Sequence, residues 1–116
     1  MTPSCTEQIR EFLNDTRKVA WFADADMNVY ARKSTRLIEG KLRKTLDIAT
    51  VEVREEMRCK RVFTNFINDM IGMNPFPILF VENIMTDRFA KYFQSQGWLS
   101  MGPYEEWQLP CYYIYT

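Results

Sequence analysis

Hydrophobic positions change their spacing near the middle of the chain, and the change predicts a strand followed by a helix. Residues 46–53 carry apolar side chains on both faces of an extended chain, as in a strand covered from both sides. In residues 61–72 the apolar positions recur in pairs four residues apart, which predicts one apolar stripe of a helix. The connecting residues 54–61 are polar and include four basic side chains. We expect a buried strand, a basic loop and a helix N-terminus, a geometry that suits a bound phosphate.

The segment before this centre predicts one helix and two strands. Ser4 and Glu7 have capping-box spacing, and a helix is expected from about Cys5 to Asn14. Residues 19–22 and 29–37 are apolar runs bounded by polar turns, which is typical of strands. Because connections this short cannot cross over to a parallel partner, these strands and the central one should form an antiparallel meander.

The segment after the centre predicts a strand, a helix and a hairpin. Ile78 to Val81 is wholly apolar and should lie parallel to the central strand through a helical crossover. Thr86 can cap the next helix. Residues 98–101 and 107–115 make the closing hairpin. The expected fold class is α/β: one domain of 116 residues with a mixed α+β sheet and helices on both faces.

Composition and charge exclude several classes of protein. The 15 basic and 15 acidic side chains balance, and a net charge of zero disfavours binding to nucleic acid. No apolar run approaches the roughly 18 residues of a membrane span, and no secretory signal is expected at the N-terminus. The three cysteines lack metal-ligand spacing and fit a reduced, cytoplasmic setting. The absence of histidine excludes Ser–His and Cys–His catalysis and most zinc sites, and no metal site is expected.

Basic side chains gather in the hairpin that leads into the central strand. Only Glu39 opposes them. They are Arg32, Lys33, Arg36, Lys41, Arg43 and Lys44. The favoured interpretation is a solvated edge that resists aggregation. The alternative is a binding surface for an acidic partner.

Two stretches, in the right order, resemble the GNAT acetyltransferase superfamily, with coverage from about Val19 to Tyr115. Residues 46–63, Leu-Asp-Ile-Ala-Thr-Val-Glu-Val-Arg-Glu-Glu-Met-Arg-Cys-Lys-Arg-Val-Phe, are similar to the family's fourth strand and pyrophosphate loop. Residues 78–98 are similar to its fifth strand, the next helix and the Gly-aromatic pair that begins the closing hairpin. The short chain also resembles phage-encoded members of the family.

The chain departs from the family pattern at the loop and on the following helix. The family's loop reads Arg or Gln, two residues, Gly, one residue, then Gly or Ala, and here it reads Arg58-Cys-Lys-Arg-Val-Phe63. Arg61 and Phe63 therefore replace small residues that let a backbone approach a diphosphate closely. Phe93 stands where the family has a tyrosine that acts as general acid.

The resemblance implies acetyl-coenzyme A bound where strands 46–53 and 78–81 separate, and direct transfer of its acetyl group to an amine. Backbone N–H groups of the central strand would polarise the acetyl carbonyl, and the loop would bind the pyrophosphate. The implied coenzyme-binding residues are Val51, Val53, Arg58, Cys59, Lys60, Arg61, Val62, Phe63 and Asn83.

The same resemblance implies a catalytic base and an acid. Glu52, Asp47 and Glu82 are the carboxylates near the implied acetyl site, and Glu52 lies closest along the chain. We predict Glu52 as the base, against an ordinary role as a polar strand residue. Tyr92 is the tyrosine nearest to the expected acid position, against a role in core packing.

Two functions of different classes remain open. The first is an N-acetyltransferase that acts on an amine of a protein or a small molecule. The second is a catalytically degenerate GNAT-fold protein that binds a partner through its basic hairpin or aromatic C-terminus. The intact strand–loop–helix segment favours the first, whereas the missing glycines and tyrosine favour the second.

Overall fold

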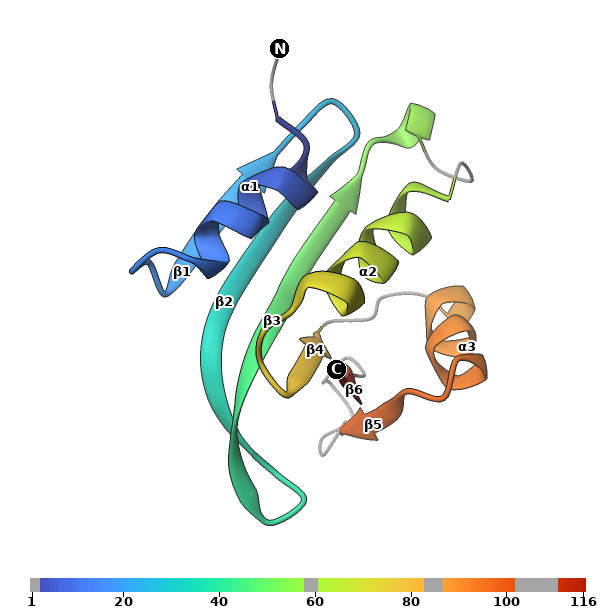
Figure 1. The fold of residues 1–116 in the computed structure, drawn as a ribbon. Helices are drawn as coiled ribbons and strands as arrows, with labels where there is room; N and C mark the ends of the chain where they lie inside the picture. The colour runs from blue at the N-terminus through green and yellow to red at the C-terminus, as the bar shows by residue number, and fades with distance from the viewer. Residues whose placement is uncertain (1–2, 58–60, 83–86, 102–110) are drawn as a thin grey trace.

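The structure, a computed structural model, describes residues 3–57, 61–82, 87–101 and 111–116. Its elements follow the predicted order (Figure 1). They are α1 Cys5–Leu13, β1 Val19–Ala23, β2 Met27–Ile38, β3 Lys41–Val53, the 3₁₀ helix η1 Glu55–Met57, α2 Val62–Met73, β4 Ile78–Val81, α3 Asp87–Ser95, β5 Leu99–Met101 and β6 Cys111–Tyr115. Thr86 and residues 107–110, part of the predicted helix cap and hairpin, lie outside the described residues.

Six strands form one mixed sheet in the order β1-β2-β3-β4-β6-β5. β1, β2 and β3 pair antiparallel, which confirms the meander, and β3 pairs parallel with β4 across α2. β6 then enters antiparallel between β4 and β5. The predicted fold class is therefore confirmed, with β2 and β3 longer than the sequence pattern indicated.

The described helices cover only one face of the sheet, so the expectation of helices on both faces is wrong for the described part of the chain. The main core joins alternate strand residues to the apolar stripes of α1, α2 and α3. Ile9, Ile67 and Phe93, one from each helix, are completely buried in it. Alternation along the strands places the neighbouring side chains on the opposite face.

That opposite face is held by charged and aromatic side chains. The Asp47 carboxylate has no exposed surface and accepts hydrogen bonds from Thr45 Oγ1 at 2.6 Å and Arg36 Nη2 at 2.9 Å. Arg32 and Arg36 both pair with Glu82 at the end of β4. The guanidinium of Arg36 also lies 4.0 Å from the centre of the Phe80 ring. Three neighbouring strands are thereby tied together without a covering helix.

β2 and β3 are joined by a two-residue turn of Glu39 and Gly40. Both residues have positive φ, 51° and 81°, as a type I′ turn requires. Glutamate is an unusual residue for this left-handed conformation. Its carboxylate accepts hydrogen bonds from the hydroxyls of Tyr113 and Tyr115 on β6.

Candidate functional site

β3 continues in the sheet beyond the end of β4. All four residues of β4 pair parallel with Thr45 to Ile48, and Glu82 N–H still donates to Ile48 O at 3.0 Å. The pairing of β3 with β2 continues as far as Val53. Residues 49–53 therefore extend beyond the last paired position of β4, and a separation of the two strands stays a prediction, because residues 83–86 lie outside the described part of the chain.

β3 carries an extra residue directly after its last pairing with β4. Tyr30 pairs with Thr50, but the next residue, Ala31, pairs with Ile48, so Ala49 is bulged. A bulge increases the local twist and bends its strand, and bulges are frequent beside functional sites. The bulge therefore lies where β3 leaves its pairing with β4.

The predicted residues of this β3 segment face opposite sides of the sheet. Val51 and Val53 pack against the core beneath the helices. Glu52 is exposed and lies on the helix-free face, because side chains alternate along a strand. Asn28 is its cross-strand partner. If Glu52 acts as a base, its carboxylate therefore lies on the face of the sheet that no described helix covers.

α2 begins directly after the predicted pyrophosphate loop, and Arg61 occupies its N-cap position. Arg61 has φ 60° and ψ 18°, the left-handed conformation, and its side chain makes no capping hydrogen bond. This is the position where the family has glycine, and the backbone adopts the conformation that glycine favours. The arginine side chain itself is exposed. The local backbone is thus preserved although the small residue is missing.

Phe63 replaces the second small residue of the loop, and its ring lies between α2 and α3. The ring centre is 4.5 Å from that of Phe89 and 6.0 Å from that of Phe93. Val62 and Phe63 are both half-buried against the main core. At this position the side chain fills space that a glycine or alanine would leave open.

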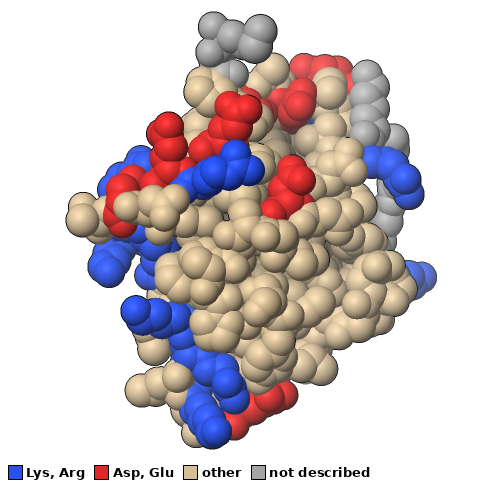
Figure 2. All heavy atoms as spheres, in the orientation of Figure 1, with Lys and Arg blue, Asp and Glu red and all other residues tan. Residues whose placement is uncertain are grey.

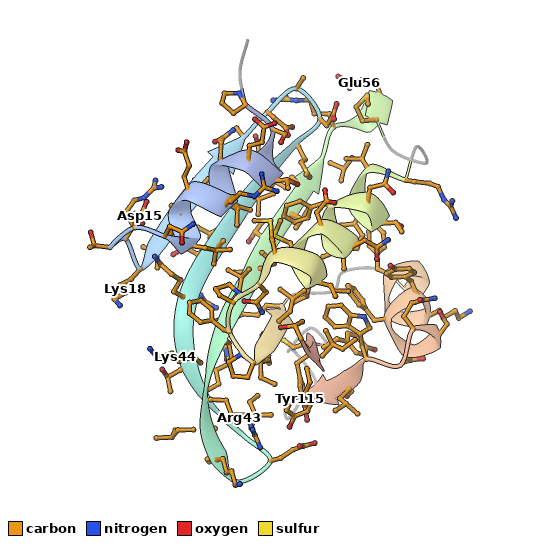
Figure 3. All side chains as sticks on the ribbon, in the orientation of Figure 1. Asp15, Lys18, Arg43, Lys44, Glu56 and Tyr115 are labelled. Carbon is orange, nitrogen blue, oxygen red and sulfur yellow. The ribbon has the colours of Figure 1, made fainter. Side chains whose placement is uncertain are left out.

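Four predicted coenzyme-binding residues, Arg58, Cys59, Lys60 and Asn83, lie outside the described residues. The described part of the loop contributes Arg54 and Arg61, which are exposed. Arg54 donates to Asp24 O at 3.2 Å. Glu56 lies at the end of the molecule that is distant from the β2–β3 turn (Figure 3).

The predicted acid Tyr92 lies on α3 beside Phe93, with ring centres 5.4 Å apart, and is half-buried against the core. Phe93 is completely buried and stacks on Tyr112 of β6 at 5.4 Å. Tyr112 pairs with Val81, the last residue of β4, and its hydroxyl accepts a hydrogen bond from Gln94 at 3.0 Å. The sequence did not reveal this tyrosine, because only the β4–β6 register brings it beside the end of β4.

Asp47 and Glu82, the other two candidate bases, are ion-paired to Arg36. Burial of Arg36 opposes its charge, but the hydrogen bond and charge of Asp47 and the charge of Glu82 raise the pKa of Arg36 above its ordinary value. Both carboxylates serve as its permanent acceptors, which leaves Glu52 as the exposed carboxylate of the three.

A cavity of about 400 Å³ lies between the N-terminal turn of α1, the β1–β2 turn and the first half of α2. Four carboxylates and one guanidinium line it: Glu7, Asp24, Asp26, Asp69 and Arg10. Its net negative charge would repel a phosphate. The cavity is therefore unsuitable for an anionic coenzyme.

Asp24 organises the wall of this cavity. Burial alone would raise its pKa, but hydrogen bonds from the backbone N–H groups of Cys5, Asp26 and Met27 hold the pKa of Asp24 below its ordinary value. Burial, followed by the charge of Asp24, raises the pKa of the Cys5 thiol to about 12. Cys5 is therefore a neutral core residue at physiological pH.

The described residues contain neither a metal-binding cluster nor a membrane-spanning helix. No group of three or more Asp, Glu or Cys side chains is arranged to hold a metal ion. No described helix combines the length and apolar character needed to cross a bilayer.

Comparison with known proteins rests on structure. No protein-family model matches the chain, and no curated sequence matches it. The AtaT Y144F mutant toxin bound to the C-terminus of the antitoxin AtaR and acetyl-CoA superposes with a TM-score of 0.59 at 11% identity, over 78% of this chain and 59% of that one. A chain of the KacTA–DNA complex gives 0.61 at 11% identity, over 95% and 80%.

The Arabidopsis thaliana protein Naa50, in complex with the bisubstrate analogue CoA-Ac-MVNAL, gives a TM-score of 0.51 at 14% identity, over 78% of this chain and 64% of Naa50. These neighbours are GNAT-fold acetyltransferases. The chain has the GNAT fold. It spans about three fifths of the length of AtaT. The resemblance stated from the sequence is confirmed at the level of fold.

Proposed function

We propose that the protein is an acetyl-CoA-dependent N-acetyltransferase that transfers the acetyl group directly to an amine. One observation carries this proposal. β3 is bulged where its pairing with the parallel neighbour β4 ends, and the chain then enters α2 through a left-handed residue in a GNAT fold. Acetyl-CoA and a CoA-containing analogue are bound in the AtaT and Naa50 structures.

In this proposal the coenzyme phosphates bind at the start of α2. Arg58, Lys60 and Arg61 supply positive charge, and the loop amides and helix dipole add to it. Asn83 would contact the pantetheine arm, and Cys59 and Val62 would be further coenzyme-binding residues. Amides of Val51 and Val53 polarise the acetyl carbonyl. Phe63 contacts the coenzyme where the family has a small residue.

Glu52 is the proposed base. An alkylammonium acceptor must lose a proton before it attacks, and the exposed Glu52 carboxylate can accept that proton through water. The proton required by the departing thiolate comes from a tyrosine. Tyr92 is the residue predicted from sequence, and Tyr112 is the alternative that the β4–β6 register supports. The acceptor is an amine of a protein or a small molecule, and the proposed setting of this phage-encoded protein is the cytoplasm.

A specific observation favours a second candidate function. The Phe63 ring occupies the space between α2 and α3, in contact with Phe89. If that ring excludes the coenzyme, the protein is a degenerate GNAT-fold binding protein. The two functions differ in whether acetyl-CoA binds to the parent protein.

Calorimetric titration with acetyl-CoA distinguishes them. For the enzyme, we expect binding to the parent protein and at least about tenfold weaker binding to Arg58→Ala, because a charged hydrogen bond to phosphate is lost. Arg17→Ala, an exposed arginine paired with Asp15, is the matched control and should bind as the parent does. Glu52→Gln should keep binding but lose turnover, measured as release of free thiol with an amine acceptor.

Different results would identify the binding protein. Absence of binding to the parent, with binding gained in Phe63→Ala or Arg61→Gly, would show a closed coenzyme site. Absence of binding in all variants would contradict both the coenzyme site and the enzymatic function.

If the parent protein is active, the turnover of Tyr92→Phe and Tyr112→Phe at high pH would identify which of the two tyrosines is the acid.

A further inference from the structure

The β2–β3 hairpin continues beyond the rest of the sheet as a two-stranded arm, defined here as residues 35–44. β1 pairs with β2 only as far as Arg32, and β4 pairs with β3 only from Thr45 onward. Among the described strands, none flanks the arm on either edge. Figure 1 shows it as a projection at the end of the molecule away from η1.

One face of the arm is fastened to the sheet. Ile38 is completely buried against Ile78, Phe80 and Tyr113. The Arg43 guanidinium lies 5.3 Å from the centre of the Tyr115 ring and donates to Ile38 O at 3.3 Å. Together with the contacts of Glu39, these interactions hold the arm in a fixed position. A partner would therefore meet a preorganised surface, which lowers the entropy cost of binding.

The other face of the arm exposes a pair of leucines. Leu37 and Leu42 are direct cross-strand partners, so their side chains lie together on one face. They are 65% and 75% exposed, respectively. On the same face, Lys44 pairs with Thr35 in the adjacent row. The arm thus presents an apolar centre beside a cation.

The basic side chains of this region fall into two groups. Arg32, Arg36 and Lys33 are engaged with carboxylates of the sheet and of the α1–β1 connection. Lys41 and Lys44 are exposed and form no ion pair with the described residues. Figure 3 shows Lys44 together with Arg43 on the arm. Lys44 lies on the face of the leucine pair, whereas Lys41 is the cross-strand partner of Ile38 and lies on the other face beside the turn.

A solvated protective edge does not explain this composition. Charged residues alone prevent edge-to-edge pairing, and exposed leucines work against that purpose. The charges are also unevenly distributed over the molecule. On the face shown in Figure 2, blue side chains predominate around the arm, with one red patch at its end, and most of the red side chains lie in the upper half, where blue side chains also occur.

We propose that the arm binds an acidic segment of another protein, one with leucine-like side chains between its carboxylates. The apolar side chains cover Leu37 and Leu42, and a carboxylate pairs with Lys44 on the same face. The open strand edges allow such a segment to add as a further strand through main-chain hydrogen bonds. A polypeptide fits better than a nucleic acid, because a phosphate backbone offers nothing apolar to the leucines.

The experiment uses three labelled probes and fluorescence anisotropy. The first is a short peptide in which two leucines are separated by one residue and flanked by glutamates. The second has serines in place of the leucines, and the third is a single-stranded oligonucleotide of the same charge. The first probe should bind at least about tenfold more tightly than the other two, because two exposed leucines become covered.

Matched variants locate the binding. Leu37→Ser with Leu42→Ser should weaken binding of the first probe at least about tenfold. Lys44→Gln should remove most of its salt dependence, and Lys41→Gln, on the opposite face, should remove less. Leu99→Ser and Lys91→Gln change an exposed leucine and an exposed lysine elsewhere and should have no effect. All six positions are exposed, so each variant should keep the thermal midpoint of the parent.

Three outcomes would overturn the proposal. The first is equal binding of the leucine and serine peptides, or no binding of either. The second is tighter binding of the oligonucleotide. The third is self-association of the parent in sedimentation equilibrium that disappears in the double leucine variant, because the occupant of the arm would then be a second copy of the chain.

Discussion

Both faces of the sheet contain completely buried residues, but different chemistry buries them. The helix-covered face is apolar, with completely buried residues from α1, α2 and α3. The opposite face has no described helix, yet Asp47 and Thr45 on it are also completely buried. Arginine stems, a cation–π contact and ion pairs exclude the water there. Apolar packing excludes water from one face, and a network of ion pairs and hydrogen bonds excludes it from the other.

The largest effect is expected on the helix-covered face. Phe93→Ala removes a completely buried ring that contacts Tyr112, Trp98 and Phe63. The variant should lose about 3–5 kcal/mol of unfolding free energy, because the lost contacts leave a cavity. Urea denaturation measures this loss. Lys91→Ala, on an exposed position of the same helix, should change it by less than about 0.5 kcal/mol.

A smaller loss is expected on the helix-free face. Asp47→Ala removes the acceptor of Thr45 Oγ1 and Arg36, but the Arg36 side chain is 29% exposed and keeps Glu82. The unfolding free energy should fall by about 2–3 kcal/mol, the usual range for a charged hydrogen bond. Asp15→Ala, in an exposed ion pair with Arg17, should cost less than about 1 kcal/mol. Equal losses in the two variants would show that the network contributes little.

Sequence patterns predicted the helix-covered face better than the helix-free one. Hydrophobic periodicity identified α2 and β4, because burial beneath a helix leaves a regular apolar signal. The same apolar signal also led to the prediction that helices cover both faces, which is wrong for the described residues. Ile78 and Phe80 are buried beneath arginine and tyrosine side chains, and an apolar run does not reveal which kind of neighbour covers it.

The candidate site was predicted in part. The start of α2 follows from local sequence, and the structure has it. The separation of β3 from β4 stays a prediction, because β4 is paired along its whole length and residues 83–86 lie outside the described part of the chain. The bulge at Ala49 has no sequence signature here, since alanine is an ordinary strand residue and only the register with β2 reveals it. Tyr112 was missed for the same reason. Long-range register is set by tertiary packing, which a single sequence does not display.

A third prediction concerns the β1–β2 turn, where a polar residue fastens the helix-covered face. Asp24→Ala should lose about 1 kcal/mol of unfolding free energy, because Cys5, Asp26 and Met27 lose the acceptor of their N–H groups. The folded-state pKa of Asp24 is lowered, so its contribution is present above the unfolded pKa of about 3.9 and is lost as pH falls through the folded value. Urea denaturation at neutral and acidic pH should show the difference between parent and variant shrinking on acidification. A constant difference would contradict an ionised Asp24.

The smallest effect is expected where the arm meets β6 on the helix-free face. The hydrogen bond to Glu39 is the first cause that raises the pKa of Tyr115, followed by desolvation. A raised folded-state pKa means that this contact stabilises the fold fully below the unfolded tyrosine pKa of about 10 and is lost as pH rises through the folded value. Tyr115→Phe should therefore lower the thermal midpoint slightly at neutral pH and leave it unchanged at strongly alkaline pH.

The hydroxyl, rather than the ring, is responsible for this pH dependence. Phenylalanine keeps a ring for the Arg43 guanidinium, so the variant removes only the hydrogen bond to Glu39. Glu39→Gln is the matched control: it keeps an acceptor in the turn but removes the negative charge that disfavours the phenolate. The ultraviolet titration of Tyr115 should then move towards the ordinary tyrosine range. If Tyr115 titrates identically in the parent and in Glu39→Gln, the carboxylate does not fasten the arm, and the helix-free face is held only by its buried residues and arginines.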